Sequence, residues 1–308
     1  MRPREIGSLV KQAGTEWLED KVPRLGAALA YYTVFAIAPV LILAIAIAGL
    51  VFSREAVQRQ VLGQLRDLVG EQGGEAVRSM LVSAGESGYT ATAVGIALLL
   101  ISAMALFGQL QDAMNTIWRV RPKPGRGVRG FLKDRLLSLT MVLGTAFLLL
   151  VSLVVSTVLA AVVSLLGARQ IGITGQVVDA VISLAVFTPL FAMIYRYLPD
   201  AEIVWKDVWL GAGLTAVLFV LGKVLIGLYI GHSAIASVFG SAGSLVVLLI
   251  WAYYAAQIFL FGAELTRVYA NRFGSRIVPE PGAVAVTDEQ REAQGMAPAG
   301  EGRGAGQR

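Results

Sequence analysis

Three polar residues near the end of a long apolar run have the types and spacing to do chemistry together. Tyr253, Gln257 and Glu264 follow one another four and seven residues apart, so a helix places them on one face. Such a stripe faces protein or a cavity rather than lipid. It can line a path for a polar substrate, or it can form hydrogen bonds between helices that pack together. The spacing leaves both interpretations open.

Lys223, Asp179 and Arg196 also lie within or at the ends of apolar runs. A charge is costly there and marks a candidate functional residue. Lys223 lies at a depth where Asp179 can reach it, although its long side chain can also extend to the outer headgroups. Glu264 lies near the opposite membrane boundary. There we expect it to pair with Arg196 or with Arg267.

Two prolines interrupt apolar runs at corresponding depths. Pro39 and Pro189 each leave a carbonyl without its helical donor, and in hydrocarbon another helix, a hydroxyl or water must satisfy that group. Paired interruptions of this kind indicate a midplane site in transporters that are built from inverted repeats. Ordinary helix kinks are the alternative.

The sequence offers little for enzymatic chemistry. It contains one histidine, His232, and no cysteine, so His-cluster and thiolate metal sites and thiol nucleophiles are excluded. A phosphate-binding loop of the form G-x-x-x-x-G-K-[ST] does not occur, so we expect no ATPase activity. We therefore expect a protein that is not an enzyme and has no metal or cofactor.

Composition indicates what positions these residues. The 308-residue chain is 56% hydrophobic and only 15% charged, with a mean hydropathy of +0.68, whereas soluble domains carry about 25% charged residues. About 20 residues of helix cross a bilayer. The sequence predicts an all-α, polytopic membrane protein with six transmembrane helices, over residues 27–52, 90–112, 136–166, 177–198, 207–230 and 243–269.

Basic residues predict the orientation. Of the 26 lysines and arginines, 20 lie on the side of the N-terminus and five on the other, while Lys223 lies inside a span. Both termini should therefore be cytoplasmic. The basic loop RVRPKPGRGVRG at 119–130 then faces anionic lipid headgroups, which we favour over nucleic acid as its partner.

Three segments lie outside the predicted spans: residues 1–26, residues 271–308, and an outer loop, residues 53–89, within the six-helix domain of residues 27–270. Residues 1–26 predict an amphipathic cytoplasmic helix, and residues 53–89 predict two amphipathic helices separated at Gly70–Gly74, which cover the bundle or lie on the outer membrane surface. Residues 271–308 are rich in Gly, Pro, Ala and charge, and this composition predicts a disordered tail.

Four segments resemble the YihY/BrkB family of bacterial inner-membrane proteins. They are AALAYYTVFAIAPVL at 27–41, LQDAMNTIWRV at 110–120, YRYLPDAEIVWKDVWLGA at 195–212 and GSAGSLVVLLIWAYYAAQIFLFGAEL at 240–265. The resemblance covers about residues 10–275. The chain departs from it at Val238-Phe-Gly240, where a Tyr-Gly pair is more usual. It implies six spans and cytoplasmic termini, which agrees with the distribution of charge.

The resemblance implies less about activity. Members have been labelled as a tRNA-processing ribonuclease, which the absence of nuclease chemistry contradicts here. Transport, including transport of lipids or envelope precursors, is the other suggestion. We expect a permease or lipid translocator whose path is lined by the first, fourth and sixth spans. The alternative is a membrane scaffold for envelope integrity. Substrate, coupling ion and assembly into a homo-oligomer stay open.

Overall fold

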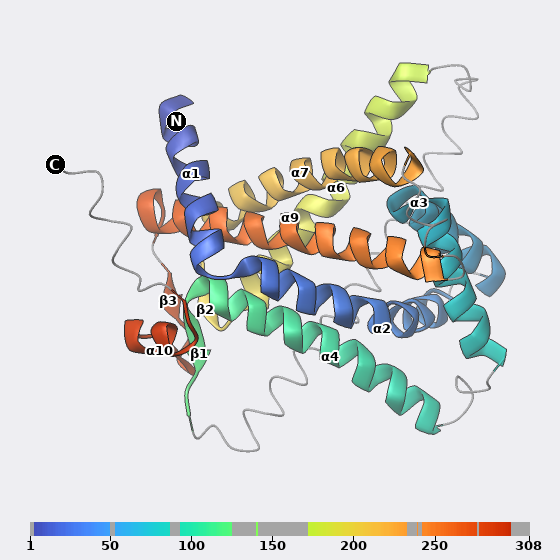
Figure 1. Cartoon of the computed structure of the whole chain (residues 1–308), viewed down its shortest axis with the longest axis horizontal. Coiled ribbons are helices and arrows are strands. Elements are labelled where there is room, and N and C mark those ends of the chain that lie inside the picture. Colours follow the sequence, from blue (N-terminus) through green and yellow to red (C-terminus); the bar gives the residue numbers. More distant parts are fainter. Residues whose placement is uncertain are drawn as a thin grey trace.

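Long helices make up most of the computed structural model (Figure 1). It describes residues 3–49, 53–86, 93–124, 140, 172–232, 239, 242–275 and 277–296. Apolar runs become helices because a helix satisfies its own backbone hydrogen bonds where water is absent. The five longest apolar helices are α2 (Val22–Ala48), α4 (Ala93–Trp118), α6 (Gly172–Tyr197), α7 (Trp205–His232) and α9 (Gly243–Phe273).

Three of the described helices are long and apolar enough to cross a membrane: Val22–Ala46, Trp205–Lys223 and Gly243–Phe273. The helices α4 and α6 cover the predicted second and fourth spans, residues 90–112 and 177–198. The predicted third span, residues 136–166, falls outside the described residues except for Thr140. A mostly helical membrane architecture is therefore established.

Helix α9 lies at the centre of the bundle and packs against α2, α7, α1, α3 and α4 (Figure 1). The largest buried apolar cluster joins α2, α4, α6, α7 and α9, with members such as Met114, Tyr195 and Leu260. A second cluster joins α2, α3 and α9 around Val57, Val77 and Leu248. All six side chains are at most 1% exposed, so both clusters are fully packed.

Helix α3 (Arg54–Glu86) is the segment predicted as two amphipathic helices over residues 53–89. The backbone bends at Gly70, where φ is 78° and ψ is 170°. Glycine tolerates this left-handed φ because it has no Cβ. Both halves bury apolar side chains, Val57 and Val61 before the bend and Val77 and Leu81 after it, against α2 and α9. The described part of this segment therefore covers one end of the bundle.

The opposite end of the bundle carries α1 (Pro3–Glu19), the short helix α10 (Asp288–Ala293) and four short strands, at the left in Figure 1. Strand β1 (Val120–Pro122) pairs antiparallel with β4 (Ala283–Ala285), and β2 (Ala201–Glu202) with β3 (Val278–Pro279). We call this the strand end. The chain following α4 and the chain following α6 are thus each tied to the C-terminal segment.

The C-terminal segment differs from the tail predicted over residues 271–308. Helix α9 continues to Phe273, and residues 277–296 form β3, β4 and α10. Thr287 and Gln290 form a capping box that begins α10, and Met296 beyond it is 7% exposed. The prediction of disorder was wrong over these residues because the strands take their partners from β1 and β2, far away in the sequence.

Candidate functional site: a buried ion-pair cluster

The structure separates the three residues of the predicted stripe on α9. Tyr253 is 38% exposed. Gln257 is partly buried, and its Nε2 donates to the Pro23 carbonyl of α2 at 3.4 Å. Glu264 is fully buried at the strand end. Of the three residues, only Glu264 contacts another charged side chain in the part of the chain that the structure describes.

The other predicted residues lie on separate helices. Pro39 and Pro189 lie inside α2 and α6, and both are partly buried. Lys223 is partly buried on α7, next to Gly222, whose surroundings include Tyr254 of α9. The side chain of Asp179 lies outside the described residues, so its pairing with Lys223 stays a prediction.

Glu264 pairs with Arg267, one of the two partners that its position predicted. The Nη2 and Nε atoms of Arg267 donate to Glu264 Oε2 at 2.8 and 3.2 Å. Arg196 does not join this pair in the described structure, where its buried Nε has no hydrogen-bond partner. A spacing of three residues puts Glu264 and Arg267 side by side on the helix.

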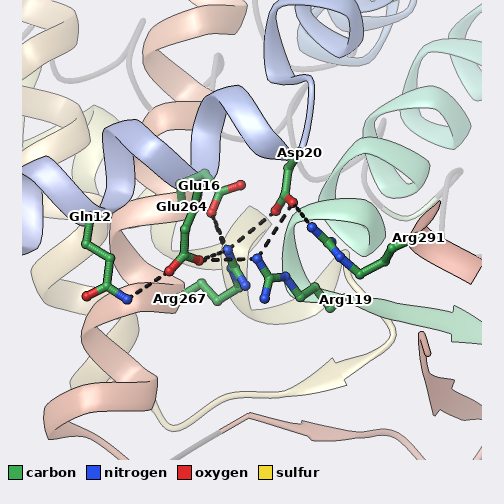
Figure 2. A network of polar contacts seen from close by, with 7 residues as sticks. All are labelled: Gln12, Glu16, Asp20, Arg119, Glu264, Arg267 and Arg291. Atoms are coloured by element: carbon green, nitrogen blue, oxygen red, sulfur yellow. Dashed lines mark hydrogen bonds and ion pairs between the residues drawn. The ribbon is translucent and has the colours of Figure 1, made fainter. Parts of the chain in front are cut away.

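Six charged side chains form what we call the ion-pair cluster (Figure 2): Glu16, Asp20, Arg119, Glu264, Arg267 and Arg291. They come from α1 and the turn after it, the turn after α4, α9 and α10. Four of them, Asp20, Glu264, Arg267 and Arg291, are at most 3% exposed. Three carboxylates and three guanidinium groups are thus held together at the strand end.

Asp20 contacts arginines from three different parts of the chain. Arg291 Nη2 lies 2.5 Å from Asp20 Oδ1, Arg119 Nη2 lies 3.7 Å from the same oxygen, and Arg267 Nη2 lies 3.4 Å from Oδ2. Glu16 also contacts both Arg119, at 3.4 Å, and Arg267. The two carboxylates of the α1 region therefore connect α4, α9 and α10.

Local backbone geometry positions two parts of this cluster. Glu16 and Asp20 are four residues apart, so α1 and its last turn present them on the same side. Arg119 follows the last residue of α4 with a φ of 56°, a left-handed conformation that costs about 1 kcal/mol or more outside glycine. That turn directs the chain from α4 into β1 and leaves the Arg119 guanidinium at the carboxylates.

Two groups at the edge of the cluster have shifted pKa values. Burial lowers the pKa of Arg119, and the neighbouring charge of Arg267 lowers it further, although the group stays cationic at physiological pH. Burial raises the pKa of Glu19, with a further increase from the carboxylate of Glu16. Glu19 is therefore a carboxylate whose charged form is disfavoured in the folded protein.

Replacing Glu19 by glutamine should stabilise the protein at neutral pH. Because the folded pKa lies above the unfolded one, the penalty is absent below the ordinary value of 4.5 and is fully present above the folded pKa. The variant should therefore melt above the wild type at neutral pH, and the two should melt together at acidic pH. Thermal unfolding in detergent measures this. Glu202→Gln, at an exposed position on β2, should change melting at neither pH, and equal shifts at both pH values would contradict the explanation.

A second buried polar contact joins two segments at the strand end. Asn115 of α4 donates from Nδ2 to Asp200 Oδ2 at 2.9 Å, and its Oδ1 accepts from the Asp200 backbone N–H at 2.8 Å. Both residues lie in segments that carry the family resemblance, and both are at most 7% exposed. This pair fixes the end of α4 to the chain that leaves α6.

Asn115→Ala should destabilise the protein by about 1 to 3 kcal/mol, because it removes the partner of a buried backbone donor. Thermal unfolding of the purified protein measures the loss. Thr116→Ala is the matched control, since the Thr116 hydroxyl bonds only the Asp112 carbonyl of its own helix among the described contacts. The control should cost about 0.5 kcal/mol or less. Equal losses at both positions would show that the contact with Asp200 contributes nothing.

Sequence reasoning missed most of the cluster. Glu16 and Asp20 receive no role from the sequence patterns, and Arg119 and Arg291 count there only among the basic residues that indicate topology. One signal could have found the first two: a pair of acids four residues apart at the end of an amphipathic helix that leads directly into a span. For Arg291 no local signal exists, because its partner Asp20 lies 271 residues away.

Comparisons with known proteins agree with the family resemblance. The family model for virulence factor BrkB matches residues 13–286. The UPF0761 membrane protein of Azotobacter vinelandii is 29% identical over 270 residues, which cover 86% of this chain and 64% of that protein. The UPF0761 membrane protein of Delftia acidovorans is 31% identical over 268 residues, covering 80% and 58%.

The chain thus spans about three fifths of the length of the relatives that it matches. No solved structure matches it significantly. The match to the family model covers most of the chain, from the second part of α1 to β4, and ends before α10. This chain therefore belongs to the YihY/BrkB family of membrane proteins.

Proposed function

We propose that this protein is a bacterial inner-membrane transporter, a permease or a lipid or envelope-precursor translocator without its own ATPase, whose cytoplasmic end is closed by the ion-pair cluster. The observation that carries the proposal is a cluster of six charged side chains, four of them buried, where four separate parts of the chain meet. Taking ions out of water costs several kcal/mol each, and apolar residues of similar volume would often hold the same elements together at least as well. A buried ion cluster has an advantage over apolar packing where the ions regain water in a second, open state of the protein.

The proposed orientation places the strand end in the cytoplasm and both termini on that side. Described basic residues at this end include Lys21, Arg119, Lys206 and Arg272, in agreement with the positive-inside rule. Three exposed aromatic side chains at this end match an interfacial belt. The ring centroids are 5.8 Å apart for Tyr197 and Trp205 and 6.1 Å apart for Trp205 and Trp209.

The depth of the cluster follows from a contact between α7 and α9. A Cβ on Gly211 would lie 2.7 Å from the Cβ of Thr266, so the two helices touch there. Thr266 precedes Arg267, and Gly211 lies two residues after Trp209. The ion-pair cluster therefore lies at the level of the proposed cytoplasmic boundary, where opening would expose it to water.

Six spans are part of the same proposal. Helix α4 ends at the strand end, and α6 also ends there, at Tyr195 and Tyr197 beside α9 and β2. The chain must therefore return to the opposite end of the bundle between α4 and α6. Residues 136–166, the predicted third span, lie between these two helices in the sequence. A reporter that is active only in the cytoplasm should therefore work when fused after Arg129 or Arg272 and be silent near Gly73 or His232. Activity at Gly73 would overturn the orientation.

A membrane scaffold is the alternative function, and one observation favours it. Tyr195 donates to the Phe259 carbonyl at 2.6 Å and lies 3.0 Å from the Thr215 hydroxyl, so these deep polar groups hold α6, α7 and α9 together. Gln257 likewise bonds α2. In a scaffold, polar groups between helices serve packing and none of them becomes accessible.

Labelling of a single cysteine separates the two functions, because the natural chain has no cysteine. Ala212 on α7 is 0% exposed in the core that lies behind the cluster, and Leu18 on α1 is 65% exposed. In inside-out vesicles, a membrane-impermeant maleimide should label Leu18→Cys at once. It should label Ala212→Cys slowly, but much faster than the protein unfolds. Labelling of Ala212→Cys only at the rate of unfolding would support the scaffold.

A second measurement addresses the class of substrate. Proteoliposomes with a dye-labelled phospholipid are treated with a reductant that reaches only the outer leaflet. A lipid translocator should let more than half of the dye be reduced. Loss that stops at half of the dye, in a protein whose Ala212→Cys variant is labelled, would exclude that phospholipid as a substrate and favour a permease for another solute.

A further inference from the structure

We propose that the closed ion-pair cluster binds one exchangeable proton, on Glu264, and releases it to the cytoplasm when this end opens. The inference rests on the proposed transport function and names its coupling ion.

Three carboxylate oxygens converge on a single nitrogen atom. Around Arg267 Nη2 lie Oε2 of Glu16, Oδ2 of Asp20 at 3.4 Å and Oε2 of Glu264 at 2.8 Å. An Nη nitrogen carries two hydrogens. Two of these oxygens at most can therefore accept a well-aligned hydrogen bond from it, and three full negative charges repel one another. A proton on one carboxyl group removes one of these charges and adds a donor.

Glu264 is the carboxyl group with the least compensation. Glu16 contacts Arg119 and Arg267 and accepts from Gln12 Nε2 at 2.8 Å. Asp20 contacts three arginines. Among the described residues, Glu264 contacts one cation, the Arg267 guanidinium, and its other close ionisable neighbour is the Asp20 carboxyl group.

The environment of the second carboxyl oxygen of Glu264 also favours a proton on this residue. Oε1 is buried without a hydrogen-bond partner in the described structure, and the whole residue is 0% exposed. Figure 2 shows the Glu264 carboxyl group directed into the cluster, with contacts drawn from one of its oxygens. A buried carboxylate oxygen without a donor is costly, whereas the neutral acid form carries no charge to compensate.

Ionisable groups of the cluster surround Glu264. Asp20 of the α1 region and Arg267 of α9 act on Glu264 directly, and Glu16, Arg119 and Arg291 belong to the same cluster, with Glu19 at its edge. On α7, the buried Asp207 accepts from the Ser275 backbone N–H and hydroxyl, and the residues of α2 and α7 in the largest apolar cluster, such as Val22, Leu25 and Ala212, carry no ionisable group.

Exchange with the cytoplasm runs past the outer part of the cluster. The side chains of Glu16 and Arg119 are 16% and 18% exposed, and Glu16 lies on the same Arg267 nitrogen as Glu264. On opening, water reaches both oxygens of Glu264. The O–H bond then breaks, its electron pair stays on the carboxylate oxygen, and the proton passes to cytoplasmic water. Protons therefore favour the closed state and their loss favours the open state.

Cysteine labelling as a function of pH tests this assignment. For Ala212→Cys in inside-out vesicles, the labelling rate, corrected for the reactivity of a free thiol at each pH, should rise about fivefold or more from mildly acidic to mildly alkaline conditions. Adding Glu264→Gln, which mimics the neutral acid, should hold the rate at its acidic level throughout. Adding Glu264→Asp should keep a pH dependence. Glu19→Gln, which changes a neighbouring carboxyl group outside these contacts, should leave the dependence as it is.

The outcomes separate the two proposals. A pH dependence that survives in Glu264→Gln would overturn the proton site and leave the gate intact. Failure of Ala212→Cys to be labelled at any pH would overturn the transport function itself. If Glu264→Gln does not fold, the infrared spectrum of the wild-type protein decides. A protonated carboxylic acid should be present at neutral pH and be lost at alkaline pH, and its absence at neutral pH would overturn the proposal.

Discussion

Arg267→Gln should destabilise the protein more than any other single change in the ion-pair cluster, by about 3 to 5 kcal/mol. The guanidinium of Arg267 is the shared partner of Glu16, Asp20 and Glu264, and it is 3% exposed. Its removal leaves three carboxyl groups close together with Arg119 and Arg291 as the remaining cations. We expect little monodisperse protein after extraction in detergent, and a much lower melting temperature for what is recovered.

The control for this change lies on the same helix. Arg272→Gln removes an arginine whose side chain donates to the Ser8 hydroxyl at 3.0 Å and lies 5.2 Å from the Phe273 ring, at an exposed position. Exposed contacts of this kind contribute about 1 kcal/mol or less. Similar melting temperatures for the two variants would show that burial of the Arg267 charge contributes little to stability.

A double replacement distinguishes the loss of the contact between Glu264 and Arg267 from the loss of a buried charge. Glu264→Gln combined with Arg267→Gln removes both members of the closest pair on α9. The double variant should then be more stable than the sum of the two single losses predicts, with a coupling of about 0.5 to 3 kcal/mol. Strictly additive losses would mean that the two side chains act independently.

The helical architecture could be predicted from the sequence because apolar runs of this length have few alternatives in a membrane. The pairing of Glu264 with Arg267 was also within reach, since residues three apart on a helix are neighbours. The rest of the cluster was not. Glu16 and Arg267 are 251 residues apart, and no periodicity in the chain connects them.

The error in the C-terminal segment has a similar cause. Composition measures how much apolar surface a segment can bury by itself, and residues 271–308 can bury little. Strands β3 and β4, of two and three residues, instead complete hydrogen bonds offered by β2 and β1. A local signal did exist at Thr287 and Gln290, which match the Thr-x-x-Gln pattern of a capping box and mark the start of α10.

Gly262→Ala should be the most damaging small change in the core between the helices. A Cβ at this position of α9 would lie 1.8 Å from Thr215 Oγ1, 2.6 Å from the Tyr195 hydroxyl and 2.9 Å from Thr215 Cβ. Both neighbours are 0% exposed, so neither can move into open space. The methyl group must separate α9 from α7 or break the hydrogen bonds of the Tyr195 hydroxyl, and overpacking of this kind costs about 1 to 3 kcal/mol.

Gly213→Ala is the matched control, because it makes the same chemical change in α7 at a position where a Cβ meets nothing within 4 Å. In a helix, replacing glycine by alanine lowers the entropy of the unfolded chain, so this variant should gain about 0.4 to 1 kcal/mol. Thermal unfolding of the two purified variants should therefore shift in opposite directions from the wild type. A stable Gly262→Ala variant would mean that α7 and α9 can separate there at little cost, as two helices would on either side of a path that opens between them.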